Sequence, residues 1–322
     1  MHLAVYLPLV IPVLAALAAR PLADRLPPAA ATWLLAGSSL ALAAASSAVL
    51  GLLALTALVR VPPVAAIANM SVQAISRSDT VSLPVAIAAG ALLAAAAAAA
   101  CRAVWRRGTA IVAAGRQASR LPGSGQVVVT EDDAADAYTL PGWPCRIVIT
   151  SGMLRALTES ERKVLVAHER AHAGGSHYLF TSAARLAAAA NPLLRPVAAQ
   201  VGYTVERWAD ERAATAAGDR PLTARAIARA AMASTAAPPD RAGQATALGL
   251  VGDKDAERKE KASLRRAGPV PRRVAALLGP PPRASLLLLA GAVLLVALSG
   301  ASALEAARNL HHLVELAQAA RS

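Results

Sequence analysis

Residues 159–175 read ESERKVLVAHERAHAGG, and their apolar and polar positions repeat with the period of an α-helix. His168 and His172 are four residues apart, so a helix places both imidazoles on the same face. The run HERAH thus has the HExxH pattern, in which two histidines bind one Zn²⁺ ion. The glutamate of the pattern, Glu169, is then placed to accept a proton from water at the metal.

Signals at both ends of the segment support a helix. Thr158 followed by Glu161 is a capping box, and Gly174 with Gly175 would end the helix just after His172. Five residues alone leave open a surface helix that carries two histidines without a metal. The segment that follows argues against this alternative.

A third ligand is available in the next helical segment, 205–218, which reads VERWADERAATAAG. Glu206 follows His172 by 34 residues (206 − 172), enough for one helix to run out and another to return. Together with His168 it would complete a three-ligand zinc site with a fourth position open for water, as in catalytic zinc sites. Asp210, one turn on, would hold the free imidazole N–H of a ligand histidine. The alternative for Asp210 is a solvated carboxylate paired with a nearby arginine.

The wider set of motifs resembles a known family. Residues 136–172 read DAYTLPGWPCRIVITSGMLRALTESERKVLVAHERAH, and residues 206–214 read ERWADERAA. This order is similar to that of the integral-membrane zinc metallopeptidases of the BlaR/MecR type, which are related to the HtpX and CAAX-prenyl protease types. The resemblance implies a gluzincin-like zinc protease domain with one Zn²⁺ per chain. It implies that the zinc ligands are His168, His172 and Glu206. It further implies that Glu169 is the base and that Asp210 is a supporting carboxylate.

The composition indicates a membrane protein. Hydrophobic residues make up 56% of the chain, and the mean hydropathy is +0.45. A membrane-spanning helix needs about 20 predominantly apolar residues, and four stretches qualify: 3–19, 33–59, 83–104 and 284–304. We therefore predict a mainly α polytopic membrane protein with about four transmembrane helices. Its membrane domain, 1–104, would hold three of them, and 284–322 the fourth and a short tail.

Basic residues predict the orientation. They lie after the first and third apolar stretches and before the fourth, at Arg20, Arg25, Arg102, Arg106, Arg107, Arg116, Arg120, Arg272, Arg273 and Arg283. Because cytoplasmic loops carry the excess of Lys and Arg, the N-terminus would lie outside the inner or plasma membrane and 105–283 in the cytoplasm. Anionic lipid headgroups then account for the net charge of +13, and we expect no direct contact with nucleic acid.

The cytoplasmic protease domain, 105–237, is predicted to be α+β. The β-branched runs 126–130 and 146–150 would form a small sheet beside the HExxH helix. The three residues Tyr138, Thr139 and Leu140 are a candidate edge strand, which would hold an extended substrate by backbone pairing. The alternative is an ordinary buried turn before Pro141.

Four further features receive structural interpretations. Cys145 is interpreted as a loop cysteine rather than a zinc ligand, and His177 as a surface residue rather than a transition-state stabiliser. The apolar stretch 178–199 is interrupted by charged residues and proline, so we expect it to pack on the ligand helices or lie at the membrane surface. Residues 238–283 are charged and are interpreted as a basic linker, either a flexible tether or a site of proteolytic cleavage.

The residues together predict a zinc metalloendopeptidase that hydrolyses cytoplasmic or membrane-associated proteins. The resemblance suggests that the substrate is a transcriptional repressor in a signalling pathway, although no C-terminal sensor domain is expected in 305–322. One alternative is a housekeeping protease for membrane-protein quality control. The other is a non-catalytic, zinc-stabilised membrane transducer, but a structural zinc site would not need Glu169 as a base.

Overall fold

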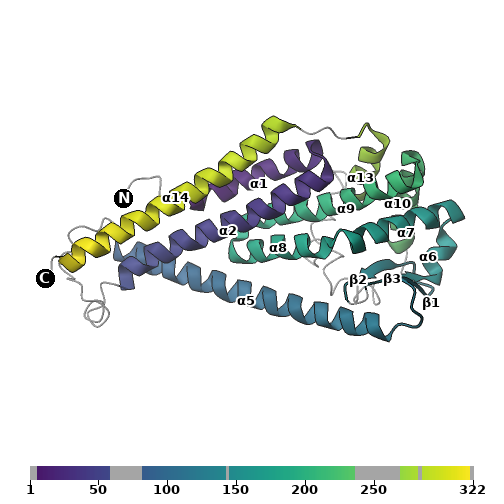
Figure 1. Cartoon of the computed structure of the whole chain (residues 1–322), viewed down its shortest axis with the longest axis horizontal. Helices are drawn as coiled ribbons and strands as arrows, with labels where there is room; N and C mark the ends of the chain where they lie inside the picture. Colours follow the sequence, from purple (N-terminus) through teal and green to yellow (C-terminus); the bar gives the residue numbers. More distant parts are fainter. Residues whose placement is uncertain (1–5, 59–81, 143–144, 236–268, 282–284, 320–322) are drawn as a thin grey trace.

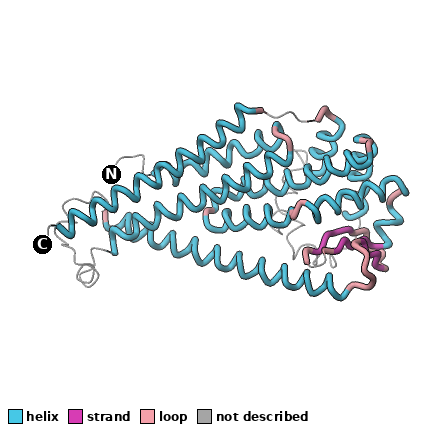
Figure 2. Tube along the Cα trace, in the orientation of Figure 1, coloured by secondary structure: helices cyan, strands magenta, loops and turns pink. Residues whose placement is uncertain are grey.

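Long helices dominate the chain, and a small sheet lies at one end of the elongated molecule (Figures 1 and 2). The computed structural model describes residues 6–58, 82–142, 145–235, 269–281 and 285–319. Four of its helices are long and apolar enough to cross a membrane: α1 (Leu7–Arg25), α2 (Pro28–Leu58), α5 (Leu83–Arg120) and α14 (Leu286–Ala319). The predicted number of candidate membrane spans is thus confirmed.

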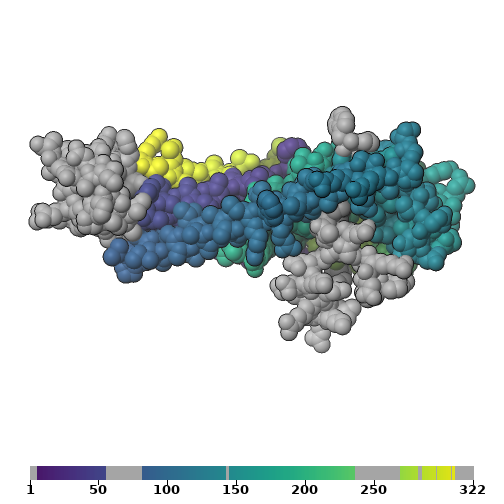
Figure 3. Space-filling view, turned by 90° about the horizontal axis from the view of Figure 1, so that it is seen from below, coloured from purple at the N-terminus to yellow at the C-terminus, as the bar shows by residue number. Residues whose placement is uncertain are grey.

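Helix α5 is much longer than the span predicted within it. Its 38 residues correspond to roughly 57 Å, about twice the thickness of the hydrocarbon core of a bilayer. The boundary predicted between the membrane and protease domains, at 104–105, falls inside this continuous helix. Figure 3 shows α5, in blue, running along one face toward the end of the molecule that carries the sheet. A single helix therefore connects the membrane-length part with the site described below.

The sheet has three strands, β1 (Val127–Thr130), β2 (Ala137–Leu140) and β3 (Arg146–Thr150), in the order β1-β3-β2. β1 pairs with β3 in parallel, and β2 pairs with β3 in antiparallel fashion. Both strands predicted from β-branched runs are confirmed to within one residue. Every residue of the central strand is buried, whereas β2 lies at an edge of the sheet.

The segments that carry the predicted metal ligands lie on helices that follow the sheet. These are α6 (Ser151–Ala156), α7 (Glu159–Gly174), α8 (His177–Ala190), the short 3₁₀ helix η2 (Pro192–Leu194), α9 (Arg195–Ala217) and α10 (Arg220–Thr235). The predicted capping box starts α7: Glu161 accepts hydrogen bonds from Thr158, and Arg229 of α10 pairs with the same carboxylate at 2.7 Å. Burial alone would raise the pKa of Glu161, but these hydrogen bonds and Arg229 hold that pKa below its ordinary value.

The apolar stretch 178–199 forms most of α8 and the turn into α9. As predicted, it packs on a ligand helix, since α8 lies against α9, and it also contacts α2 and α5. Polar contacts hold this hairpin in place: Asn191 donates to Ser46 at 3.1 Å, and Thr32 donates to Thr204 at 2.9 Å. The HExxH helix is therefore continued by a hairpin that packs among the membrane-length helices.

The interpretation of 238–283 as a linker is wrong for its last part. Residues 238–268 lie outside the described residues, but α13 (Pro269–Leu278) is a helix that packs on α9 and α10. Val274 and Leu277, one turn apart, pack against Ala214, Ala224 and Ile227. In the sequence this short apolar face follows a charged run and is too short to indicate a helix. Its role is recognised only from its packing against α9 and α10.

Candidate metal centre

Three predicted ligands meet where α7 packs against α9. The Nε2 atoms of His168 and His172 are 3.1 Å apart. The two carboxylate oxygens of Glu206 lie 3.6 Å from the first and 3.5 Å from the second. Within the described ranges, these three residues form the one group of three or more His, Cys, Asp or Glu residues close enough to hold a metal ion.

The donor set fits zinc. Zn²⁺ binds imidazole and carboxylate at about 2.0–2.2 Å in a tetrahedron, which places neighbouring donor atoms roughly 3.3 Å apart. The three distances given above bracket this value. Cys145 is a free thiol that lines the pocket beside these residues, but it does not belong to the three-residue group.

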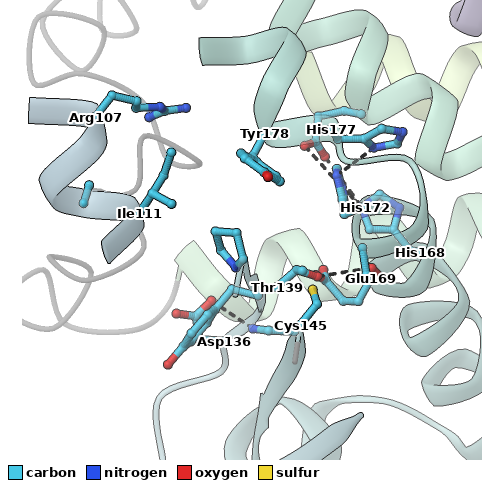
Figure 4. A pocket seen from close by; sticks show the side chains of 16 residues that line it. Arg107, Ile111, Asp136, Thr139, Cys145, His168, Glu169, His172, His177 and Tyr178 are labelled. Carbon is cyan, nitrogen blue, oxygen red and sulfur yellow. Dashed lines mark hydrogen bonds and ion pairs between the residues drawn. The ribbon is translucent and has the colours of Figure 1, made fainter. Parts of the chain in front are cut away.

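The glutamate of the HExxH pattern is buried beside the ligands. Glu169 Oε2 accepts a hydrogen bond of 2.9 Å from Thr139 Oγ1 on β2. Burial raises the pKa of Glu169, which is the direction expected for a group that must accept and release a proton near neutral pH. Figure 4 shows Glu169 and Thr139 linked by this bond below His168 and His172.

Asp210 lies behind the first ligand histidine, with Oδ1 3.0 Å from His168 Nδ1. It is 1% exposed, so it is not the solvated carboxylate of the alternative interpretation. The nearby arginine Arg207 instead donates to the carbonyl of Ala23 at 2.5 Å. A carboxylate in this position orients a ligand histidine and favours the tautomer that leaves Nε2 free for the metal.

Arg273 of α13 was missed by the sequence analysis. Its guanidinium donates twice to Asp210, at 2.7 and 2.6 Å, and reaches Glu206 at 3.0 Å. Burial alone would raise the pKa of both carboxyls, but the charge of Arg273 lowers both values, with contributions from the histidines. The one available signal was the apolar spacing of Val274 and Leu277 beside two arginines.

The expectation of a surface position for His177 is wrong. This residue is 2% exposed, and its Nδ1 lies 3.0 Å from Nδ1 of His172. It is the first residue of α8 after a short turn, so its side chain packs back onto the end of α7. Burial and the neighbouring His172 lower the pKa of His177 to about 3, so its ring is neutral.

A cleft opens in front of these residues. Arg107 and Ile111 of α5 form the wall opposite the HExxH histidines, and Tyr178 lies above (Figure 4). Of the three predicted edge-strand residues, Tyr138 and Thr139 line the cleft. The third, Leu140, is fully buried and packs in a cluster with alanines of α5.

A second pocket lies on the side of the candidate ligands that faces α10 and α13. Both pockets are lined by Ala137, His168, Glu169 and Glu206. The candidate metal centre therefore borders both pockets.

A helix with HExxH, crossed by a second helix that supplies a glutamate ligand, defines a metallopeptidase. Residues 104–280 match the family model of peptidase family M48, more than half of the chain, and the protein belongs to this family of zinc metallopeptidases. No curated protein sequence and no solved structure matches the chain.

Proposed function

We propose that this protein is a zinc metalloendopeptidase of the cell membrane. The observation that carries the proposal is the convergence of His168, His172 and Glu206 beside the buried Glu169. The three proposed ligands and the proposed base thus line one cleft, at the end of a bundle of membrane-length helices.

The chemistry proposed is hydrolysis of a peptide bond. Zinc, when bound by the three ligands, would polarise the scissile carbonyl and make water more acidic. Glu169 accepts the proton of the attacking water and delivers it to the leaving amine. Thr139 keeps the carboxylate directed at the cleft, and Asp210 keeps the ring of His168 in its ligand orientation.

The two pockets support an endopeptidase in particular. An endopeptidase must accommodate chain on both sides of the bond that it cleaves, and the two pockets share their lining at the candidate metal centre. An extended substrate would pair with β2, whose Tyr138 and Thr139 line the larger pocket.

We further propose that the site faces the cytoplasm and that its substrate is a transcriptional repressor, as in BlaR/MecR-type signalling. The basic residues that flank the membrane-length helices support this orientation. Reporter fusions after positions 25 and 258 should be cytoplasmic, and fusions after 78 and 322 external. An external reporter at 258 would contradict the repressor hypothesis.

The catalytic assignment is tested on purified protein in detergent. We expect about one zinc per chain, loss of the metal in His168→Ala and Glu206→Ala, and retention of the metal without hydrolysis in Glu169→Gln. Unchanged peptidase activity in Glu169→Gln would contradict the assignment of the base. Comparing the proteomes of cells that express wild type or Glu169→Gln would identify the substrates. A broad set would favour membrane-protein quality control over signalling.

A further inference from the structure

We propose that His177 is a positioning residue for the metal ligand His172, and that the turn between α7 and α8 serves to place it. This inference rests on the proposed metal site but concerns a residue that belongs neither to the HExxH pattern nor to the pair Glu206 and Asp210. Three independent features of the structure support it.

The first feature is the geometry of the two rings. Nε2 of His172 faces the other ligands, so Nδ1 is the nitrogen left over, and Nδ1 of His177 lies 3.0 Å from it. A neutral histidine that ligates a metal through Nε2 carries its proton on Nδ1. His172 would therefore donate to His177, whose own proton is then on Nε2. Figure 4 shows this contact as a dashed line between His177 and His172.

The second feature is the backbone of the turn. Ser176 has a φ of 47° and is the one non-glycine residue with positive φ in the part of the chain that the structure describes. Such a conformation is unfavourable for residues with a side chain and persists where the surroundings impose it. Here it directs the chain so that α8 begins with the ring of His177 against the end of α7.

The third feature is the space that Gly175 leaves. A Cβ at this position would lie 2.4 Å from Nε2 of His177 and 2.9 Å from the carbonyl oxygen of Ala171. The backbone of Gly175 has a φ of −85°, which other residues adopt freely, so it is the close approach of the ring that requires glycine. On its other side, His177 lies 4.7 Å from the ring of Trp208 on α9. The imidazole is therefore held between a ligand and the helix that carries Glu206.

The two ligand histidines thus have corresponding supports from different elements. Asp210 of α9 lies at Nδ1 of His168, and His177 of α8 lies at Nδ1 of His172. Partners of this kind fix the tautomer and the orientation of a ligand ring, and their loss typically lowers metal affinity about 10- to 100-fold.

The test uses the full chain in detergent and two variants that disturb the contact differently. His177→Phe keeps an aromatic ring beside Trp208 but removes both nitrogens. Gly175→Ala keeps His177 and displaces its ring. Ser176→Gly is the matched control, because glycine adopts a positive φ without steric cost and the contact between His177 and His172 is kept. The measurements are the zinc dissociation constant by chelator competition and the visible absorption spectrum of the Co²⁺-substituted protein.

We expect zinc affinity to fall about 10- to 100-fold in His177→Phe and in Gly175→Ala, with an altered Co²⁺ spectrum in both. His177→Gln, which restores an acceptor, should recover part of the affinity, and Ser176→Gly should match wild type. Wild-type affinity and an unchanged spectrum in either His177→Phe or Gly175→Ala would overturn the inference. Failure of the wild type itself to bind zinc would instead overturn the proposed function.

Discussion

Replacing Arg273 by glutamine should destabilise the protein most strongly when zinc is removed. Arg273 is the cation that faces two carboxylates, the buried Asp210 and the partly exposed Glu206. Removing one partner of a buried ion pair costs about 3–5 kcal/mol, because the remaining charge has no compensation. The side chain of Glu206 is 33% exposed, so water screens part of its charge, and we expect about 3 kcal/mol. For a domain of this size, that is roughly 6–12 °C in Tm.

The assay is thermal unfolding in detergent, with a chelator and with added zinc. Bound zinc offsets the same carboxylates, so the difference between wild type and Arg273→Gln should shrink when zinc is present. Arg272→Gln is the matched control: it removes the same charge from α13, but its partner Asp24 is 43% exposed. Arg272 also lies over the ring of Tyr203, and we expect the loss of both contacts to cost about 1 kcal/mol.

Two results would refute this reasoning about Arg273. The first is an equal loss of stability in the Arg272 and Arg273 variants under chelation. The second is a difference between wild type and Arg273→Gln that zinc leaves unchanged. A double-variant cycle with Asp210→Asn adds a check, because the Arg273 substitution should cost less once the buried carboxylate is neutral.

Three other changes have expected outcomes. The folded-state pKa of Glu161 lies below its ordinary value of 4.5. The stability that the cap contributes is therefore complete above about pH 4.5 and is lost as the pH falls through the lower folded-state pKa. The free energies of unfolding of wild type and Glu161→Gln should become equal in that acidic range. Thr139→Val should leave zinc content unchanged and lower kcat about 10-fold or more, since Glu169 loses its orienting hydrogen bond; unchanged kinetics would contradict this role. Gly152→Ala should lower the Tm of the protein, because a Cβ there would lie 2.2 Å from the carbonyl oxygen of Asp133; the same Tm as wild type would mean that the loop moves away without cost.

Several features of the protein could be predicted from the sequence because they depend on residues close together in the chain. The i, i+4 spacing of His168 and His172, the capping box at Thr158 and the two glycines at the end of the helix are all local. The membrane-length helices depend only on runs of apolar residues, and β1 and β3 on runs of β-branched residues. Such patterns act within one element, so no knowledge of its neighbours is needed.

Glu206 could also be predicted, for a different reason. Only a few residue types bind zinc, and the spacing to the next helix allows one helix to run out and one to return. The sequence could not show where along its length α9 crosses α7. The distances of 3.5 and 3.6 Å between the Glu206 oxygens and the histidine Nε2 atoms result from that packing.

Only the tertiary structure decided which residues surround the candidate metal ligands. Arg273 is 63 residues after Asp210 in the chain, and it reaches the site because α13 covers α9 and α10. His177 looked like a surface residue, but the chain turns at Ser176, which has a positive φ, and the His177 ring lies against His172. The wall formed by Arg107 and Ile111 exists because α5 extends past its apolar part alongside the cleft. Contacts of this kind join residues that no local pattern relates, so packing between helices decides them.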